Sequence, residues 1–68
     1  MTYTISKHRK YKGGDVLESS VRVESLVVVL DLAKREVLNG ETFEAIKRGE
    51  IGHYFADDTE FVYQIVVK

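Results

Sequence analysis

Hydrophobic and polar residues alternate along three stretches of the chain, over residues 2–12, 16–25 and 59–67. A period of two, in segments rich in Val, Ile, Tyr, Phe and Thr, is typical of β-strands that bury one face. In the last stretch, the hydrophobic residues of one face are Phe61, Tyr63, Ile65 and Val67. The pattern therefore predicts three strands, one of them at the C-terminal end, each with one face turned toward a core.

The first two stretches are separated by Gly13 and Gly14, which predicts a hairpin because glycine accepts the positive φ of tight turns. A two-residue loop would turn the apolar residues of the two strands to opposite faces. A three-residue loop over residues 13–15, or a longer loop with a bulge, brings them to one face. We therefore expect the three-residue loop. Its register pairs Lys12 with Val16, Tyr11 with Leu17, Lys7 with Val21 and Ile5 with Val23.

Residues 26–32 form the most apolar run of the chain. Valine is abundant there, and its χ1 angle is restricted in helices. We therefore expect a central strand buried on both faces, followed by a short strand over residues 36–38. The rival interpretation is a helix over residues 20–38, closed by Asn39 and Gly40, because apolar residues also recur there at helical spacing.

Residues 42–48 predict a helix. Asn39, Glu41 or Thr42 could begin it, with Thr42 preferred as the N-cap, and Gly49 suits the position just after the C-terminal end. Phe43 and Ile46, three residues apart, fall on one face of this helix and predict its contact with the core.

Asp57 and Asp58 mark a turn before the last strand, because Asp side chains hydrogen-bond to the nearby backbone. Together these elements predict a single domain over residues 1–68 of the α+β class. Its antiparallel sheet has four to five strands, with one short helix, at about residues 42–48, packed on one face.

Cysteine is absent, which excludes disulfides, thiolate zinc sites and a cysteine nucleophile. His8 and His53, the only histidines, do not specify a metal site with the scattered carboxylates, and the glycines match no phosphate-binding loop. We therefore expect no metal, no cofactor and no enzymatic activity. The apolar runs are too short to span a membrane, and no secretory pattern is present. We accordingly expect no membrane partner and a cytoplasmic location.

Charge is unevenly distributed along the chain. Residues 1–14 hold four basic and no acidic residues, for a charge of +4, whereas residues 15–68 hold six basic and eleven acidic residues, for a charge of −5. Such polarity either neutralises itself inside the fold or is available to a charged partner. The net charge of −1 argues against a dedicated nucleic-acid-binding protein.

The basic N-terminal hairpin is the predicted contact surface. Its candidate partner-binding residues are Lys7, Arg9, Lys10, Tyr11 and Lys12. We expect a small, non-enzymatic accessory or regulatory protein that docks on another protein by electrostatic steering and an aromatic anchor. A nucleic-acid-binding module using the same hairpin is the alternative, because cations and a ring can contact phosphates and bases. A third, purely structural interpretation is that the basic residues only protect an edge strand from pairing with other chains.

Two further hypotheses concern the C-terminal half. Acidic residues gather there and could mimic a nucleic-acid backbone; they are Glu41, Glu44, Glu50, Asp57, Asp58 and Glu60. The uncharged strand over residues 59–67 is core if it is central, and a site for homodimer pairing if it is an edge.

Overall fold

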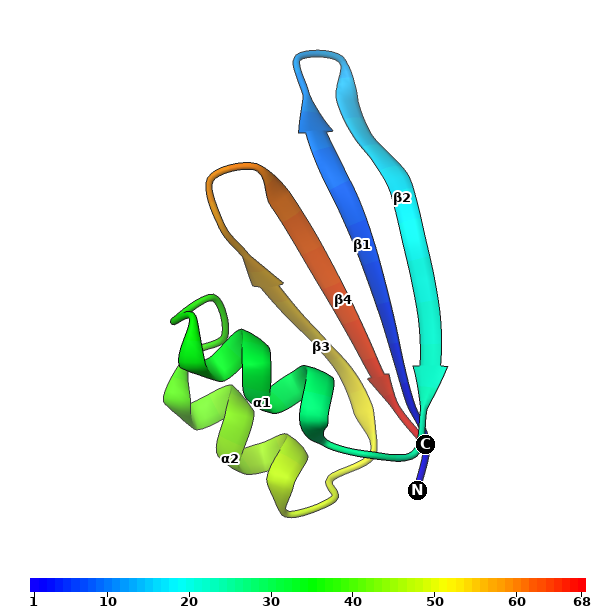
Figure 1. Ribbon diagram of the computed structural model, residues 1–68, viewed down its shortest axis with the longest axis vertical. Helices are drawn as coiled ribbons and strands as arrows, with labels where there is room; N and C mark the ends of the chain where they lie inside the picture. The colour runs from blue at the N-terminus through cyan, green and yellow to red at the C-terminus, as the bar shows by residue number, and fades with distance from the viewer.

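The computed structural model describes all residues from 1 to 68, and it contains four strands and two helices (Figure 1). In chain order these are β1 (Tyr3–Tyr11), β2 (Gly14–Val23), α1 (Val27–Lys34), α2 (Gly40–Lys47), β3 (Gly52–Asp57) and β4 (Phe61–Val67). The strands form one antiparallel sheet in the order β2-β1-β4-β3. The predicted α+β class and antiparallel sheet are confirmed, but the fold has two helices instead of one.

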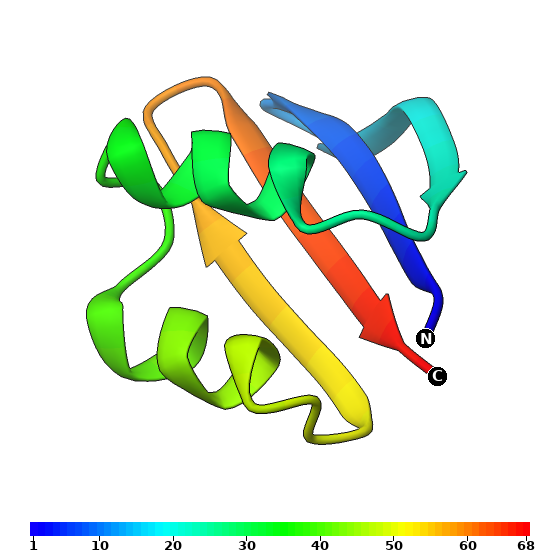
Figure 2. The same cartoon turned by 60° about the horizontal axis from the view of Figure 1, so that its bottom comes forward.

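Both helices pack on one face of the sheet, and the opposite face has no covering layer (Figure 2). The core lies between the helices and the covered face of the two central strands. Its buried residues are Tyr3, Ile5, Val29, Leu32, Leu38, Ile46, Tyr63, Ile65 and Val67. The face predicted for the C-terminal strand is therefore confirmed for Tyr63, Ile65 and Val67, whereas Phe61 is half-buried.

The strand predicted for residues 26–32 is wrong, because this segment forms α1. Val29 and Leu32 are buried against the sheet from one side of this helix. The helix propensity of Val is only about 0.7 kcal/mol or less below that of Ala, whereas burying a Val or Leu side chain contributes about 1.5–3 kcal/mol. The rival helix over residues 20–38 is right in type but too long, because β2 continues to Val23.

The short strand predicted over residues 36–38 is also wrong. This segment links the two helices, and Glu36 adopts a left-handed conformation with φ of 60°. Leu38 from this link is buried in the core. Val37 and Leu38 therefore belong to a connection between helices, which contributes Leu38 to the core.

The helix predicted over residues 42–48 is present as α2, shifted by two residues at its start. Its N-cap is Asn39, whose Oδ1 accepts a hydrogen bond from the backbone N–H of Thr42 at 2.8 Å, so the prediction of Thr42 as the cap is wrong. Gly49 follows the helix with φ of 80°, in the left-handed conformation predicted for it. Neither helix is long and apolar enough to cross a membrane.

The predicted three-residue loop of the first hairpin is wrong. The turn is Lys12–Gly13, with Tyr11 opposite Gly14, and a β-bulge at Glu18 shifts the register between the two halves of the hairpin. At the base, the pairing of Tyr3 with Val23 and of Ile5 with Val21 keeps these residues on the covered face. Between the bulge and the turn, Arg9 pairs with Val16 and His8 pairs with Leu17. The bulge therefore achieves what the longer loop was expected to achieve, but it turns Leu17 to the uncovered face.

Sequence analysis missed β3, which forms the outer strand beside β4. Its residues alternate between half-buried and exposed, with Tyr54 and Ala56 packed against the core. The turn after it contains Asp58, as predicted. Because β4 pairs with β1 on one side and with β3 on the other, the strand over residues 59–67 has no free edge. The first of the two alternatives for this strand therefore holds, because the strand is central and belongs to the core.

Candidate functional site

The hairpin of β1 and β2 projects beyond the rest of the sheet (Figure 1). β4 pairs with β1 only as far as Arg9 opposite Phe61, and one more backbone hydrogen bond joins Lys10 N–H to the Glu60 carbonyl at 2.9 Å. Beyond that point the hairpin has no neighbouring strand. The molecule is 35 Å long and only 21 and 18 Å across. The predicted site residues lie along this arm, from Lys7 near its middle to Lys12 in its turn.

Two of the four predicted cations are paired with carboxylates. Arg9 lies 3.3 Å from Glu18 across the hairpin and 3.6 Å from Glu60 in the β3–β4 turn. Lys10 lies 3.2 Å from Asp57 and donates a second hydrogen bond, of 2.7 Å, to a backbone carbonyl of the same turn. Exposed ion pairs of this kind contribute about 0–1 kcal/mol each. Their position ties the arm to the neighbouring hairpin and neutralises part of the positive charge internally.

Lys7 and Arg9 share an aromatic partner on the covered face. The Lys7 ammonium lies 3.9 Å from the centre of the Phe61 ring, and the Arg9 guanidinium lies 4.6 Å from it. Phe61 in turn packs against Tyr63, with ring centres 6.3 Å apart. Cation–π contacts at such partly exposed positions are worth about 0.5–1 kcal/mol each. They hold both basic side chains along the sheet.

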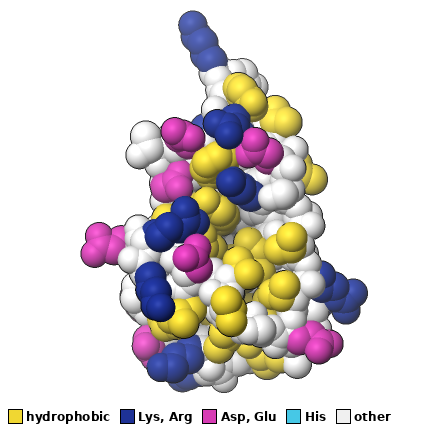
Figure 3. Space-filling model, in the orientation of Figure 1, with side chains coloured by type: hydrophobic (Ala, Val, Ile, Leu, Met, Phe, Trp, Pro, Cys, Tyr) yellow, Lys and Arg dark blue, Asp and Glu magenta, His cyan; other side chains and the backbone are white.

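Tyr11 and Lys12 make no side-chain hydrogen bond or ion pair within the chain. Tyr11 is 58 % exposed, and the neighbouring Val16 and Leu17 are each 56 % exposed. We call these four residues the hairpin tip. Figure 3 shows hydrophobic side chains near the projecting end of the molecule and a basic side chain at its extremity. The tip thus combines an aromatic ring, two aliphatic side chains and one cation without an internal partner.

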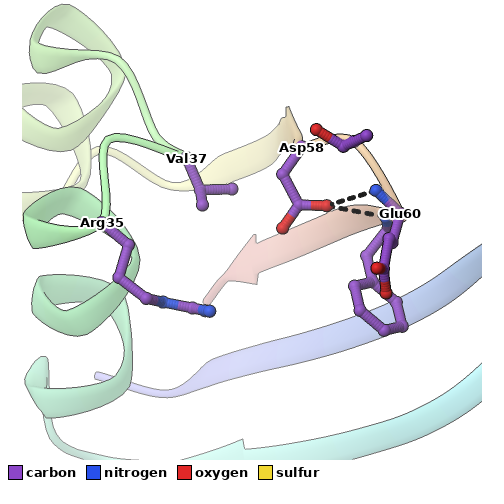
Figure 4. A pocket seen from close by; sticks show the side chains of 6 residues that line it. Arg35, Val37, Asp58 and Glu60 are labelled. Carbon is purple, nitrogen blue, oxygen red and sulfur yellow. Dashed lines mark hydrogen bonds between the residues drawn. The ribbon is translucent and has the colours of Figure 1, made fainter.

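A shallow hollow of about 380 Å³ lies between the α1–α2 link and the β3–β4 turn (Figure 4). Asp58 lines it, and its Oδ1 accepts hydrogen bonds from the backbone N–H groups of Phe61 at 2.7 Å and Glu60 at 2.9 Å. These bonds, assisted by nearby cations, hold the pKa of Asp58 below its ordinary value. Arg35 lies on the opposite wall of the hollow, and its side-chain hydrogen bond with Tyr63 raises its pKa. Arg35 is exposed and Asp58 is only half-buried, so the hollow supplies no desolvated acid or base.

The other predicted chemistry is dispersed over the surface. No group of three or more His, Cys, Asp or Glu side chains is placed to share a metal ion. Among the acidic residues considered as a nucleic-acid mimic, Asp57 and Glu60 pair with the arm and Glu50 pairs with Arg48. The acidic residues that remain without an ion pair on α2 are Glu41 and Glu44.

Val16 and Leu17 were not predicted as site residues, because alternation assigned Leu17 to the core. The bulge at Glu18 separates them from that pattern and leaves both exposed. The adjacent apolar pair Val16–Leu17, followed by the polar run Glu18–Ser20, was the available signal, since it breaks the alternation between the turn and Val21.

Comparison with known proteins identifies no relative of this chain. No protein-family model matches its sequence, no curated protein matches it, and no solved structure matches its fold.

Proposed function

We propose that this chain is a non-enzymatic accessory or regulatory protein that binds another protein through the hairpin tip. The observation that carries the proposal is the tip itself: Tyr11 is 58 % exposed, at the end of an arm that extends beyond the rest of the sheet. Exposed aromatic side chains flanked by aliphatic ones are typical of binding anchors, because they bury a large apolar area with few rotatable bonds.

The contacts of the other predicted residues support a positioning role for them. Arg9 and Lys10 are bound to carboxylates of the neighbouring strands, and Lys7 lies over Phe61. These contacts fix the middle of the arm, so little conformational freedom is lost when its tip is bound. Lys12 has no internal partner and supplies the charge that steers an acidic surface toward Tyr11.

The ion pairs also favour a protein over a nucleic acid as the partner. Binding to phosphates through four free cations would give a slope of about −3 to −4 in a plot of log affinity against log salt. Arg9 and Lys10 are already neutralised by Glu18, Glu60 and Asp57. A protein interface centred on Tyr11 would lose much less affinity with salt, because its apolar contacts are not screened and a protein surface holds no condensed counterions.

The test is site-specific photo-crosslinking in a lysate of the host, with and without nuclease. A photoreactive phenylalanine analogue replaces Tyr11 in one variant and Ile51 in the control. Ile51 is 75 % exposed and follows α2, away from the arm. We expect one discrete protein adduct from position 11 that survives nuclease and is absent from position 51. Equal adducts from both positions, or an adduct that nuclease removes, would contradict the proposal.

Binding of the identified partner then measures the anchor. Tyr11→Ala is expected to weaken binding by roughly tenfold or more, as expected for an aromatic residue at the centre of an interface. Lys12→Glu is expected to slow association mainly, because rim charges act on encounter. Ile51→Ala is the matched control and should leave the affinity unchanged.

A further inference from the structure

β2 is an edge strand with an uncovered outer side. It pairs only with β1, so the outward N–H and C=O groups along its length have no partner strand. Every residue of β2 is exposed except Val23, which is half-buried. The strand has ten residues and contains no proline. An edge of this length is a template for another strand unless its side chains oppose pairing.

The bulge at Glu18 decides which β2 side chains share a face. Val16 and Val21 are five residues apart, so a regular strand would turn them to opposite faces. Because the bulge inserts one extra residue between them, Val16 lies opposite Arg9 and Val21 lies opposite Ile5, both on the covered face of β1. Four pairs of the ladder lie on the uncovered face. They are Asp15 opposite Lys10, Leu17 opposite His8, Ser20 opposite Ser6 and Arg22 opposite Thr4.

This arrangement is complementary to itself. We propose that β2 pairs antiparallel with β2 of a second copy of this chain, about a twofold axis at Ser19, in a symmetric dimer. In this register Glu18 stays unpaired, as it does beside β1, so Asp15 lies opposite Arg22 of the second copy and Val16 lies opposite Val21 of the second copy. By symmetry each of these contacts occurs twice. Directly opposed residues of antiparallel strands share a face, and the faces assigned by the bulge satisfy this for every pair.

The complementary register is also the one with the longest overlap. Ser19 is the midpoint of the ladder between β2 and β1, which runs from Gly14 to Val23, so both strands are paired along their whole length. A shift by two residues one way places Asp15 opposite Glu24, a like charge. A shift the other way places Arg22 opposite Gly13 and Asp15 opposite Ser20, which removes the charge pair and shortens the overlap. Because like charges directly opposed are destabilising, only the central register combines full overlap with charge complementarity.

The neighbouring groups are compatible with this pairing. Glu18, which lies next to the axis, is already paired with Arg9 at 3.3 Å, so its charge is compensated within each copy. On the covered face, a hollow of about 160 Å³ separates α1 from β2; Val21 and Val28 line part of it, and charged side chains of Lys7, Asp31 and Arg35 line the rest with other residues. Val16 of the second copy would lie beside this hollow and extend its apolar wall.

Tyr11 and Lys12 lie outside the paired residues of β2, whereas Val16 and Leu17 belong to both proposed surfaces. The dimer is tested on the purified chain alone, so its failure is distinguishable from a failure of the proposed function.

Cysteine crosslinking tests the register directly, because the chain has no cysteine of its own. Opposed residues at the axis have Cα atoms about 4.5–5.5 Å apart, within the range that a disulfide spans. Under mild oxidation Ser19→Cys is expected to give a covalent dimer, whereas Ser20→Cys, the adjacent control, should stay largely monomeric. Crosslinking of both variants to the same extent, or of Ser20→Cys alone, would overturn the proposed register.

A charge-swap experiment tests the contact without any crosslink. The dissociation constant of the dimer is measured by analytical ultracentrifugation over a concentration series, with circular dichroism to check that each variant is folded. Arg22→Asp places an acidic residue opposite Asp15 of the second copy at each of the two symmetric contacts, and it should weaken the dimer at least tenfold. The double variant Asp15→Arg with Arg22→Asp restores opposite charges and should recover most of that loss.

Lys47→Asp, on the exposed side of α2, changes the net charge by the same amount as Arg22→Asp and should leave dimerisation unchanged. The proposal would be overturned if the wild-type chain stayed monomeric at all concentrations up to about 1 mM. A Kd of about 1 mM corresponds to a binding free energy of only about −4 kcal/mol. A dimer that Arg22→Asp does not weaken would also overturn the proposal, since its interface would lie elsewhere.

Discussion

The molecule contains two β-hairpins that differ in how the remaining structure covers them. In the hairpin of β3 and β4, one face lies under the helices, and Tyr63, Ile65 and Val67 are buried there. In the hairpin of β1 and β2, only β1 takes part in the core, and β2 is exposed almost throughout. β1, β2 and β4 show alternating sequences, whereas β3 does not, because Tyr54, Phe55 and Ala56 are consecutive apolar residues. Alternation therefore identifies a strand where it is present, but the helices determine which face becomes core.

The two hairpins also differ in what happens at their turns. The β3–β4 turn is closed by the Asp58 carboxylate, which binds two backbone N–H groups, and it receives ion pairs from the neighbouring arm. The β1–β2 turn has no such contacts, and its residues extend into solvent with Tyr11 exposed. The first arrangement stabilises the domain, whereas the second leaves a surface available for recognition.

Replacing a buried residue of one hairpin and an exposed residue of the other tests this difference most strongly. Ile65 is fully buried in β4, and Ile65→Ala should lower the free energy of unfolding by about 2–5 kcal/mol. For a domain of this size, this loss is comparable to the whole stability of about 3–10 kcal/mol. Leu17→Ala, in the exposed arm, should change it by about 0.5 kcal/mol or less. Urea unfolding followed by circular dichroism measures both, and similar losses would refute the contrast.

Phe61 occupies an intermediate position between the two hairpins. Its ring is half-buried and carries Lys7 and Arg9 on its surface. A fully buried Phe would cost about 3–5 kcal/mol on replacement by Ala. Because the ring is only partly covered, Phe61→Ala should cost about 2 kcal/mol, including the cation–π contacts.

The control for this variant is Phe55→Ala, in β3. Phe55 is 64 % exposed on the uncovered face of the sheet, so its loss should cost about 0.5 kcal/mol. If Phe61→Ala lowered the free energy of unfolding as much as Ile65→Ala, the Phe61 ring would be buried by the basic side chains over it, and this part of the arm would belong to the core.

The fold could be predicted where one local signal dominated. The strand faces around Ile65, the turn at Asp58 and the glycine after α2 all follow from local chemistry, and the structure confirms them. The helix at Val27–Lys34 could not be deduced from its valines alone. Its stability comes from burying Val29 and Leu32 against strands that are distant in sequence, and propensity contains no information about that contact.

The hairpin that carries the candidate site was predictable, but the contacts of its residues were not. A run of basic residues beside a glycine turn correctly indicated a hairpin. The ion pairs of the arm depend on the pairing of β1 with β4, because this pairing brings Glu60 and Asp57 beside Arg9 and Lys10. The bulge at Glu18 was equally invisible to a regular two-residue period. Non-local pairing and local irregularity therefore set the limit of what the sequence could indicate.

The smallest expected effect concerns the turn at Asp58 and depends on pH. Backbone N–H groups bound to its carboxylate lower the pKa of Asp58 in the folded state. The carboxylate therefore stabilises the fold at pH values above the ordinary Asp pKa of about 3.9, and this contribution is lost as the pH falls through the lower folded-state value. Asp58→Asn keeps an acceptor oxygen but removes the charge, so it should lower stability slightly at pH 7 and flatten the decline below about pH 4, where the two proteins converge.

Glu44→Gln, which removes an exposed charge from the middle of α2, is the control and should keep the wild-type profile. Urea unfolding of the three proteins between about pH 7 and pH 2 gives the comparison. Parallel profiles for the wild type and Asp58→Asn would show that the carboxylate closes the β3–β4 turn no better than a neutral amide. In that case the two turns would differ in geometry alone, and the greater stability assigned to the β3–β4 hairpin would rest on its buried face.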